Sequence, residues 1–272
     1  MEIIDFDDHF SDYLNQWTEK NRAKYKRVEE MEDEVPNVYL RWLNKPAQWL
    51  GGKRPSEFFE GYDAQTLANW LVDYVHSDAP VPDPLLNRLE ELGEEEPLLA
   101  LMRDASAPCE ARMHAIELLR QLDSRAPMVD YIRWQVERAC DDDLLDNALE
   151  SLHEMGADVR GPAMIAFAAA AEPGKEALLD LLCDFPPVDD AVFQFALSQF
   201  KLQPDRRALF AGYLGKMDDD RALEALCDIA ESDEVTYIDF IEIRNAIERL
   251  GGEAPIRDFR NDPTYRAVQR LQ

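Results

Sequence analysis

The acidic side chains have the most obvious chemical capacity in this sequence, because carboxylates bind cations and act as general acids or bases. Two acidic runs stand out, Asp141 to Asp143 and Asp218 to Asp220. A calcium loop of the EF-hand type needs alternating ligands, a central glycine and a terminal glutamate, and neither run has that pattern. Acids at a helix start accept hydrogen bonds from free N–H groups and favour the positive end of the helix dipole. We therefore predict that both runs cap helices.

Histidine and cysteine are the other side chains suited to metal binding, and they are scattered through separate segments. The residues are His9, His76, His114, His153, Cys109, Cys140, Cys183 and Cys227. A structural zinc site needs clustered ligands such as a C-x-x-C pair, which the sequence lacks. We expect the cysteines to be thiols, and we predict no metal site and no cofactor.

The common catalytic signatures are absent from the sequence. It has no G-x-S-x-G elbow, no Walker loop, no G-x-G-x-x-G and no H-E-x-x-H. Because acidic residues are abundant, a pair of carboxylates in this sequence does not by itself indicate a hydrolase site. We therefore nominate no catalytic residue. An enzyme whose site residues lie far apart in the sequence stays an alternative.

The charge of the chain narrows the class of partner. Its 272 residues include 56 acidic and 29 basic side chains, for a formal net charge of −27. Such a surface repels nucleic acid and anionic membranes, and it attracts basic proteins. The one basic cluster, Lys20 to Arg27, is followed at once by acids from Glu29 to Glu34, which predicts a solvated helix with internal ion pairs.

A repeated pattern identifies the elements that must position these side chains. The pattern Ala-(Ile/Leu)-Glu-x-Leu occurs at Ala115, Ala148, Ala222 and Ala246, with a degenerate copy at Ala196. The alanine, the branched residue and the leucine share one helical face, and that face must pack on a neighbour. We therefore predict a stack of similar helices at irregular spacing.

Residues of this type, an alanine-anchored helix preceded by an acidic turn, resemble the HEAT-like and armadillo-like α-helical repeat families over about residues 85–250. The resemblance implies a curved stack of helix pairs in which one helix of each pair lines a concave binding surface. The expected fold is all-α, an irregular HEAT-like solenoid with a small N-terminal helical module.

Prolines set the expected domain boundary. Pro80, Pro82 and Pro84 fall within five residues, a density that breaks a helix. We expect an N-terminal module over residues 1–80, with helices at about 7–31, 38–49 and 64–76, and a repeat domain over 85–272. The acidic first ten residues do not resemble a secretory signal, and apolar residues form stripes rather than one long run, so a cytoplasmic protein is expected.

A second resemblance lies in the N-terminal module. Trp42, Leu43 and Pro46, followed by Leu50, Gly51, Gly52, Lys53, Pro55 and Phe58, are similar to the W-L-x-x-P…L-G-G-(K/R)-x-P-x-x-(L/F) signature in the toxin-binding domain of Xre/MbcA/ParS-type antitoxins. The same residues also suit a plain helical corner, with the glycines ending one helix and Pro55 beginning the next.

These observations favour a non-enzymatic intracellular scaffold or adaptor whose acidic surface recruits a basic protein partner. A toxin-neutralising or nucleic-acid-mimicking inhibitor and a repeat-fold lyase or hydrolase are the alternatives. Tryptophan and arginine are frequent interface anchors, so Trp49, Lys53 and Arg54 near the corner are the candidate partner-binding residues.

Overall fold

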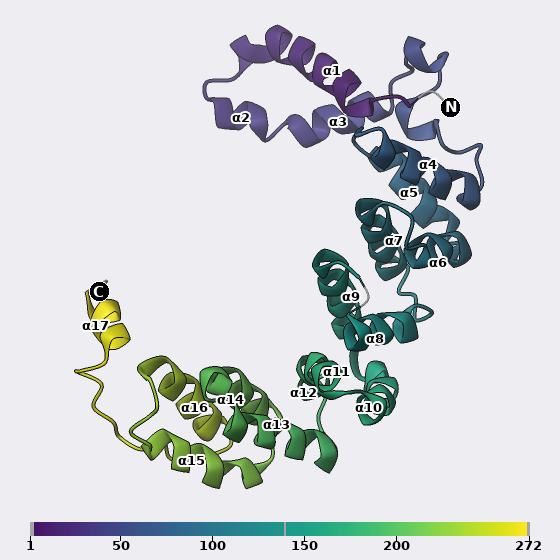
Figure 1. The fold of residues 1–272 in the computed structure, drawn as a ribbon. Coiled ribbons are helices and arrows are strands. Elements are labelled where there is room, and N and C mark those ends of the chain that lie inside the picture. The colour runs from purple at the N-terminus through teal and green to yellow at the C-terminus, as the bar shows by residue number, and fades with distance from the viewer. Residues whose placement is uncertain (1–2, 139, 271–272) are drawn as a thin grey trace. The chain divides into compact units, whose positions relative to one another are not determined.

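The regular structure of the protein is helical. The structure is a computed structural model that describes residues 3–138 and 140–270, and every regular element in them is a helix, which confirms the all-α prediction. The chain divides into two compact units, Met1–Pro127 and Met128–Gln272. The helices of unit 1 are α1 (Phe6–Asn21), η1 (Arg22–Lys24), α2 (Val28–Glu32), α3 (Val35–Leu43), η2 (Gln48–Leu50), η3 (Pro55–Glu57), α4 (Ala64–His76), α5 (Asp83–Leu92), α6 (Glu95–Arg103) and α7 (Cys109–Gln121) (Figure 1).

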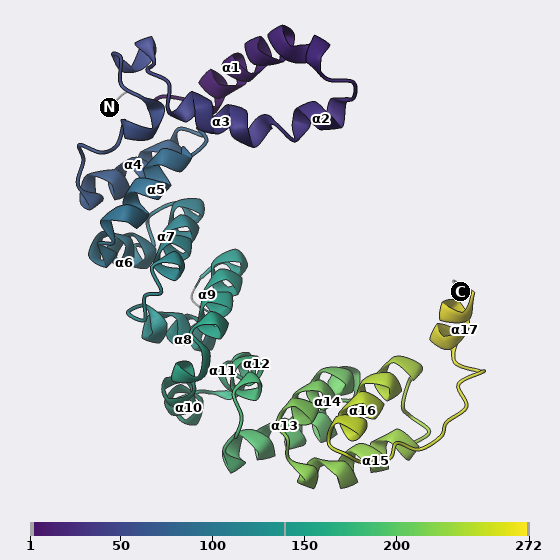
Figure 2. The ribbon, with the colours of Figure 1, turned by 180° about the vertical axis from the view of Figure 1, so that it is seen from behind.

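Unit 2 contains the remaining helices. They are α8 (Met128–Glu137), α9 (Asp142–Glu154), η4 (Gly156–Val159), α10 (Arg160–Ala169), α11 (Glu172–Ala177), α12 (Leu179–Asp184), α13 (Asp190–Leu202), η5 (Pro204–Arg206), α14 (Arg207–Lys216), η6 (Asp220–Ala222), α15 (Leu223–Glu231), α16 (Tyr237–Arg249) and α17 (Pro263–Gln269) (Figure 2).

The first helix expected in unit 1 is interrupted. The predicted helix over 7–31 is split into α1, η1 and α2, and Arg27 between the last two is extended. The run of like charges from Lys20 to Arg27 would set cations three and four residues apart on a continuous helix, which is unfavourable. The expected internal ion pairing occurs where Arg27 meets Glu30, at 3.1 Å.

Aromatic side chains form the core beneath these helices. Phe6 is buried, and its ring centroid lies 5.4 Å from that of Trp49, 5.6 Å from Phe59 and 6.4 Å from Trp42. The buried Tyr74 of α4 donates a hydrogen bond of 3.0 Å to the carbonyl of Ile4, which fixes the start of the chain to this core.

The proline-rich segment ends a helix as predicted, because α4 stops at His76 and α5 begins at Asp83. However, α4 contacts α5, α6 and α7, and Leu71 and Leu85 on either side of the prolines are fully buried. The segment is therefore a turn inside unit 1, which extends along the chain to Pro127. Whether residues 1–80 and 85–272 fold as separate domains stays a prediction.

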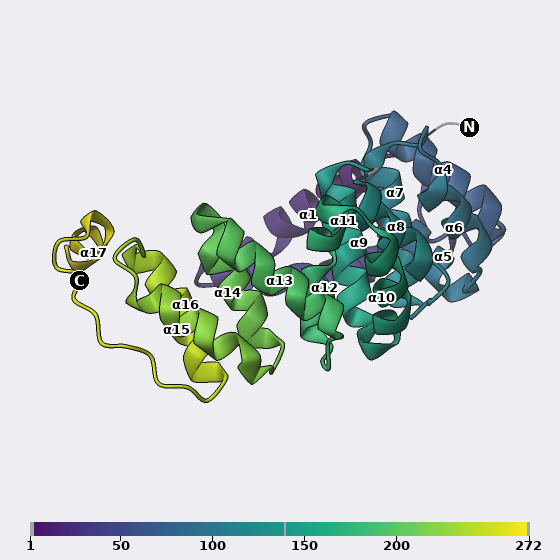
Figure 3. The same cartoon turned by 60° about the horizontal axis from the view of Figure 1, so that its bottom comes forward.

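The helices of unit 2 associate in pairs. α8 contacts α9, α10 contacts α11 and α12, α13 contacts α14, and α15 contacts α16. One member of each pair also contacts the next, so α9, α12, α14 and α16 follow one another in a row. The close association of α14 with α16 is visible in Figures 1 and 3.

The repeated alanines lie where these helices pack. Ala115, Ala148, Ala196 and Ala222 are completely buried, and Ala246 is 4 % exposed. The final copy ends as its sequence indicates, because Gly251 has a φ of +80° and the N–H of Gly252 bonds to the carbonyl of Ile247 at 2.9 Å. Such a left-handed residue closes a helix, and glycine adopts it without steric cost.

Within the described residues, no helix combines the length and the apolar character that a membrane crossing requires.

Candidate functional site

A polar groove runs along the row of helices in unit 2. It consists of two adjoining hollows of about 450 and 340 Å³ that share Asp180, Leu209 and Tyr213. We define the polar groove by the side chains Arg138 after α8, Asp146 and Leu149 of α9, Glu176 of α11, Asp180 of α12, Arg206 before α14, Leu209, Tyr213 and Lys216 of α14, and Glu242 of α16.

Helical periodicity explains why these residues face the same way. Leu209, Tyr213 and Lys216 are spaced by four and three residues, which is one face of a helix, and the buried Phe210 and Leu214 point elsewhere. Asp146 and Leu149 are similarly spaced on α9. Each helix in the row therefore buries one face, and the groove receives a mixture of charged and apolar side chains.

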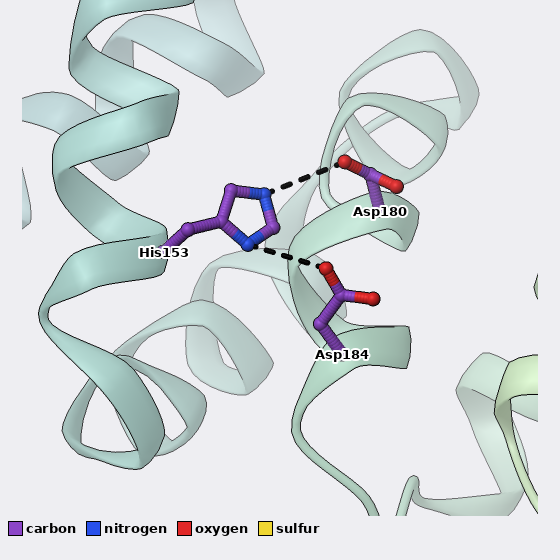
Figure 4. Close-up of side chains that lie close together, drawn as sticks. All are labelled: His153, Asp180 and Asp184. Atoms are coloured by element: carbon purple, nitrogen blue, oxygen red, sulfur yellow. Dashed lines mark ion pairs between the residues drawn. The ribbon is translucent and has the colours of Figure 1, made fainter.

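A cluster of four charged or ionisable side chains joins three helices of the row. His153 of α9 places Nε2 3.4 Å from Oδ2 of Asp180 and Nδ1 3.3 Å from Oδ2 of Asp184, both on α12 (Figure 4). Lys216 of α14 completes the cluster, with Nζ 2.7 Å from Asp184 and 3.3 Å from Asp180. The two carboxylates thus hold α9, α12 and α14 together.

The cluster brings an imidazole and two carboxylates together. Both ring nitrogens of His153 face carboxylate oxygens. His153, Asp180 and Asp184 can each offer a ligand atom within 4.8 Å of the others, so they are also the described residues that could approach a metal ion together. However, the Lys216 ammonium already supplies positive charge to both carboxylates, and it would repel a divalent cation.

The environment of the cluster shifts the pKa values of its neighbours. Burial alone would lower the pKa of Lys216, but its hydrogen bond to Asp184 and the charge of Asp180 raise that pKa above its ordinary value. Burial, with Asp180 adding to it, raises the pKa of Tyr213 to about 12. Burial likewise raises the pKa of the Cys183 thiol to about 12, so this thiol is not an activated nucleophile.

The polar groove keeps uncompensated negative charge. Glu176 is paired with Arg206, Asp180 is paired with Lys216, and the third cation of the groove, Arg138, is paired with Asp142. Asp146 and Glu242 are exposed and take part in none of the ion pairs found among the described residues. These two carboxylates are therefore available to an incoming cationic group.

The residues nominated from the sequence lie in unit 1. Trp49 of η2 is half-buried and stacks on the imidazole of His9 with ring centroids 3.9 Å apart, so it belongs to the aromatic core. Arg54 is exposed and pairs with Glu57 at 2.9 Å, and Lys53 is exposed. The corner itself has the expected form, with Gly51 left-handed after η2 and Pro55 at the start of η3. Their role in partner binding stays a prediction.

The two acidic runs differ in what they do. Asp219 accepts a hydrogen bond of 3.1 Å from the N–H of Arg221 and caps η6, as predicted. Asp141 occupies the capping position of α9, but its side chain makes no capping hydrogen bond. Instead, Asp142 in the first turn binds Arg138 at 2.9 Å, so part of this run serves an ion pair.

The four residues of the cluster were not nominated from the sequence. Positions 153, 180, 184 and 216 are distant in the chain, and folding brings them together. The sequence holds only a weak indication of the cluster. Asp180 and Asp184 are four residues apart, which places them on one face of a helix, and His153 shares a face of α9 with Leu149 in the same way.

Comparison of the chain with protein-family models, with curated proteins and with solved structures finds no match. The geometry of the groove is therefore the basis of the functional argument.

Proposed function

We propose that this protein is a non-enzymatic protein-interaction scaffold or adaptor whose polar groove receives a basic segment of a partner protein. The observation that carries the proposal is the row α9, α12, α14 and α16, which lines one groove with side chains from each helix pair of unit 2. This arrangement suits a HEAT-like solenoid, in which one helix of each pair faces the partner.

Electrostatics favours a basic partner. The chain carries a formal charge of −27, and Asp146 and Glu242 in the groove have no cation of their own among the described residues. Opposite charge accelerates encounter and selects between partners. Leu209 is 40 % exposed in the same groove and offers apolar contact beside the acids.

The test is affinity capture of the tagged protein from its native cell lysate, with elution by rising salt and identification by mass spectrometry. The proposal predicts one stoichiometric partner that is basic and that salt releases, since screening weakens exposed charge pairs. Retention of partners without any effect of ionic strength would contradict the electrostatic part.

A second candidate function, hydrolysis or a lyase reaction, is favoured by one observation. His153, Asp180 and Asp184 bring dispersed ionisable groups together beside a groove. A chromogenic-substrate screen comparing the wild type with His153→Gln tests this candidate. Turnover that His153→Gln abolishes would favour the enzyme, and the absence of any turnover would count against it.

A further inference from the structure

A second groove in unit 2 has a single charged side chain in its lining. It lies between α8 and α10, has a volume of about 500 Å³, and is lined almost entirely by apolar side chains. We define this apolar groove by Val129, Ile132, Val136, Pro162, Ile165, Ala166, Ala169 and Ala170, with Arg133 as its one charged member. Val129 is 68 % exposed and Ile165 is 76 % exposed, so two large apolar side chains stand in solvent at its edges.

The shape and composition of the apolar groove suit a helix. Ala166, Ala169 and Ala170 form a small-residue wall that lets a backbone approach closely, and Val129 and Ile165 stand beside it. An amphipathic helix recognises such a surface by setting its apolar residues into the groove at helical spacing. Exposed apolar residues that gather in one place are typical of an interaction site.

Charges around the apolar groove indicate which helix fits. Four cations on or next to α8 and α10 are engaged: Arg133 binds Asp130 at 2.8 Å, Arg138 binds Asp142 at 2.9 Å, Arg160 binds Asp189 at 3.5 Å, and Lys175 lies over the ring of Phe167 at 5.6 Å.

The acids at the ends of α8 and α10 are not engaged in this way. Glu137 ends α8, Asp158 precedes α10 and Glu172 follows it. All three are exposed, and none takes part in the ion pairs shown by the described residues. The helices that form the apolar groove therefore carry exposed carboxylates at or next to their ends, and a basic partner could neutralise these charges.

We propose that the apolar groove binds an amphipathic helix of a partner protein, with aliphatic residues on one face and Lys or Arg on its flanks. A second copy of this chain fits less well, because each copy carries a charge of −27 and would bring further acids to the same surface. The inference deepens the proposed scaffold function by naming a class of partner and a second contact surface.

The experiment uses the whole 272-residue chain and a display library of 18-residue helices. The library has Leu, Ile or Ala at positions i, i+3, i+4 and i+7, and Lys, Gln or Glu at random elsewhere. Selection is expected to enrich Lys on the flanks, and the selected peptides should bind Ile165→Asp at least about tenfold more weakly, since a buried charge opposes apolar contact. Leu202→Asp is the matched control, because Leu202 is 74 % exposed outside both grooves, and its affinity should be unchanged.

Three outcomes would overturn this inference: no enrichment, enrichment of Glu, or equal binding by Ile165→Asp and wild type. Self-association in sedimentation that Ile165→Asp abolishes would assign the groove to a second copy instead. If Ile165→Asp fails to fold, Ala169→Arg is the second variant. Ala169 is exposed and lines the groove, so the long side chain would occupy the groove without disturbing the core. These outcomes concern the apolar groove alone. The proposed function is tested separately, by lysate capture and by substitutions at Asp146 and Glu242 in the polar groove.

Discussion

Gly215 of α14 packs directly against Ala246 of α16: a Cβ placed on Gly215 would stand 2.9 Å from the Cα of Ala246 and 3.0 Å from its Cβ. Both residues are buried. The helices α14 and α16, which both line the polar groove, therefore approach each other through a glycine and an alanine. Ala246 belongs to the last copy of the repeated pattern, so the pattern marks a point of close helix contact.

The first prediction concerns this contact. Gly215→Ala should lower the free energy of unfolding by about 1–3 kcal/mol, because an added methyl group overpacks the interface. Gly212→Ala on the same helix is the matched control, since a Cβ there would meet nothing within 4 Å. The control should be neutral or slightly stabilising, as alanine favours a helix over glycine. Urea unfolding of both variants measures the difference, and equal stabilities would contradict the close packing.

Much of the fold could be predicted from the sequence, because its signals are local. The apolar stripe of Ala64–His76 and its end before the prolines predicted α4 with the bounds that the structure has. The interruption of the predicted helix 7–31 at Arg27 was missed. The helical pattern of the sequence continues through residues 20–27, where like charges disfavour a continuous helix. The prolines at 80–84 predicted the end of α4, but composition alone does not show that α4 and α5 on either side of them pack on each other.

The second prediction concerns the charged cluster. Lys216→Met should reduce stability by on the order of 1 kcal/mol, a modest value because the side chains are partly exposed. Removing the ammonium leaves Asp180 and Asp184 to repel each other. Adding Asp184→Asn to that variant should recover part of the loss. Lys201→Met, at an exposed position of α13, is the control, and an equal loss there would show that the cluster has no special role.

The third prediction concerns alkaline pH. The folded protein raises the pKa of Tyr213 from 10.0 to about 12, chiefly by burial. The neutral phenol is thus favoured on folding, so its contribution to stability is complete below pH 10 and is lost as the pH rises toward about 12. Tyr213→Phe should therefore lose stability less steeply than wild type above pH 10 in urea unfolding. Parallel curves for the two proteins would refute the shift.

The fourth prediction separates core packing from binding at the corner. Trp49→Ala should destabilise the protein by about 2–4 kcal/mol, because its indole packs on His9 and Phe6. Lys53→Ala should change stability by less than about 0.5 kcal/mol, as expected for an exposed surface residue. Thermal unfolding of both variants is the measurement. A stable Trp49→Ala protein that loses its partner would contradict this packing role and support Trp49 as a binding anchor.

The groove was harder to predict than the fold because it depends on contacts between distant segments. Composition predicted an acidic surface, and helical spacing places Leu209, Tyr213 and Lys216 on one face. Periodicity cannot say which face of α14 meets solvent or that Lys216 meets carboxylates from α12. Those facts follow from the order in which α9, α12 and α14 pack.

The most direct test of the central claim is the salt dependence of the dissociation constant for the captured partner, compared between two charge-matched double variants. Asp146→Asn with Glu242→Gln removes two acids of the polar groove, and Glu60→Gln with Glu90→Gln removes two exposed acids of unit 1. We predict weaker binding with a smaller salt dependence for the groove variant and wild-type behaviour for the control. Equal effects of the two variants would contradict the assignment of binding to the polar groove.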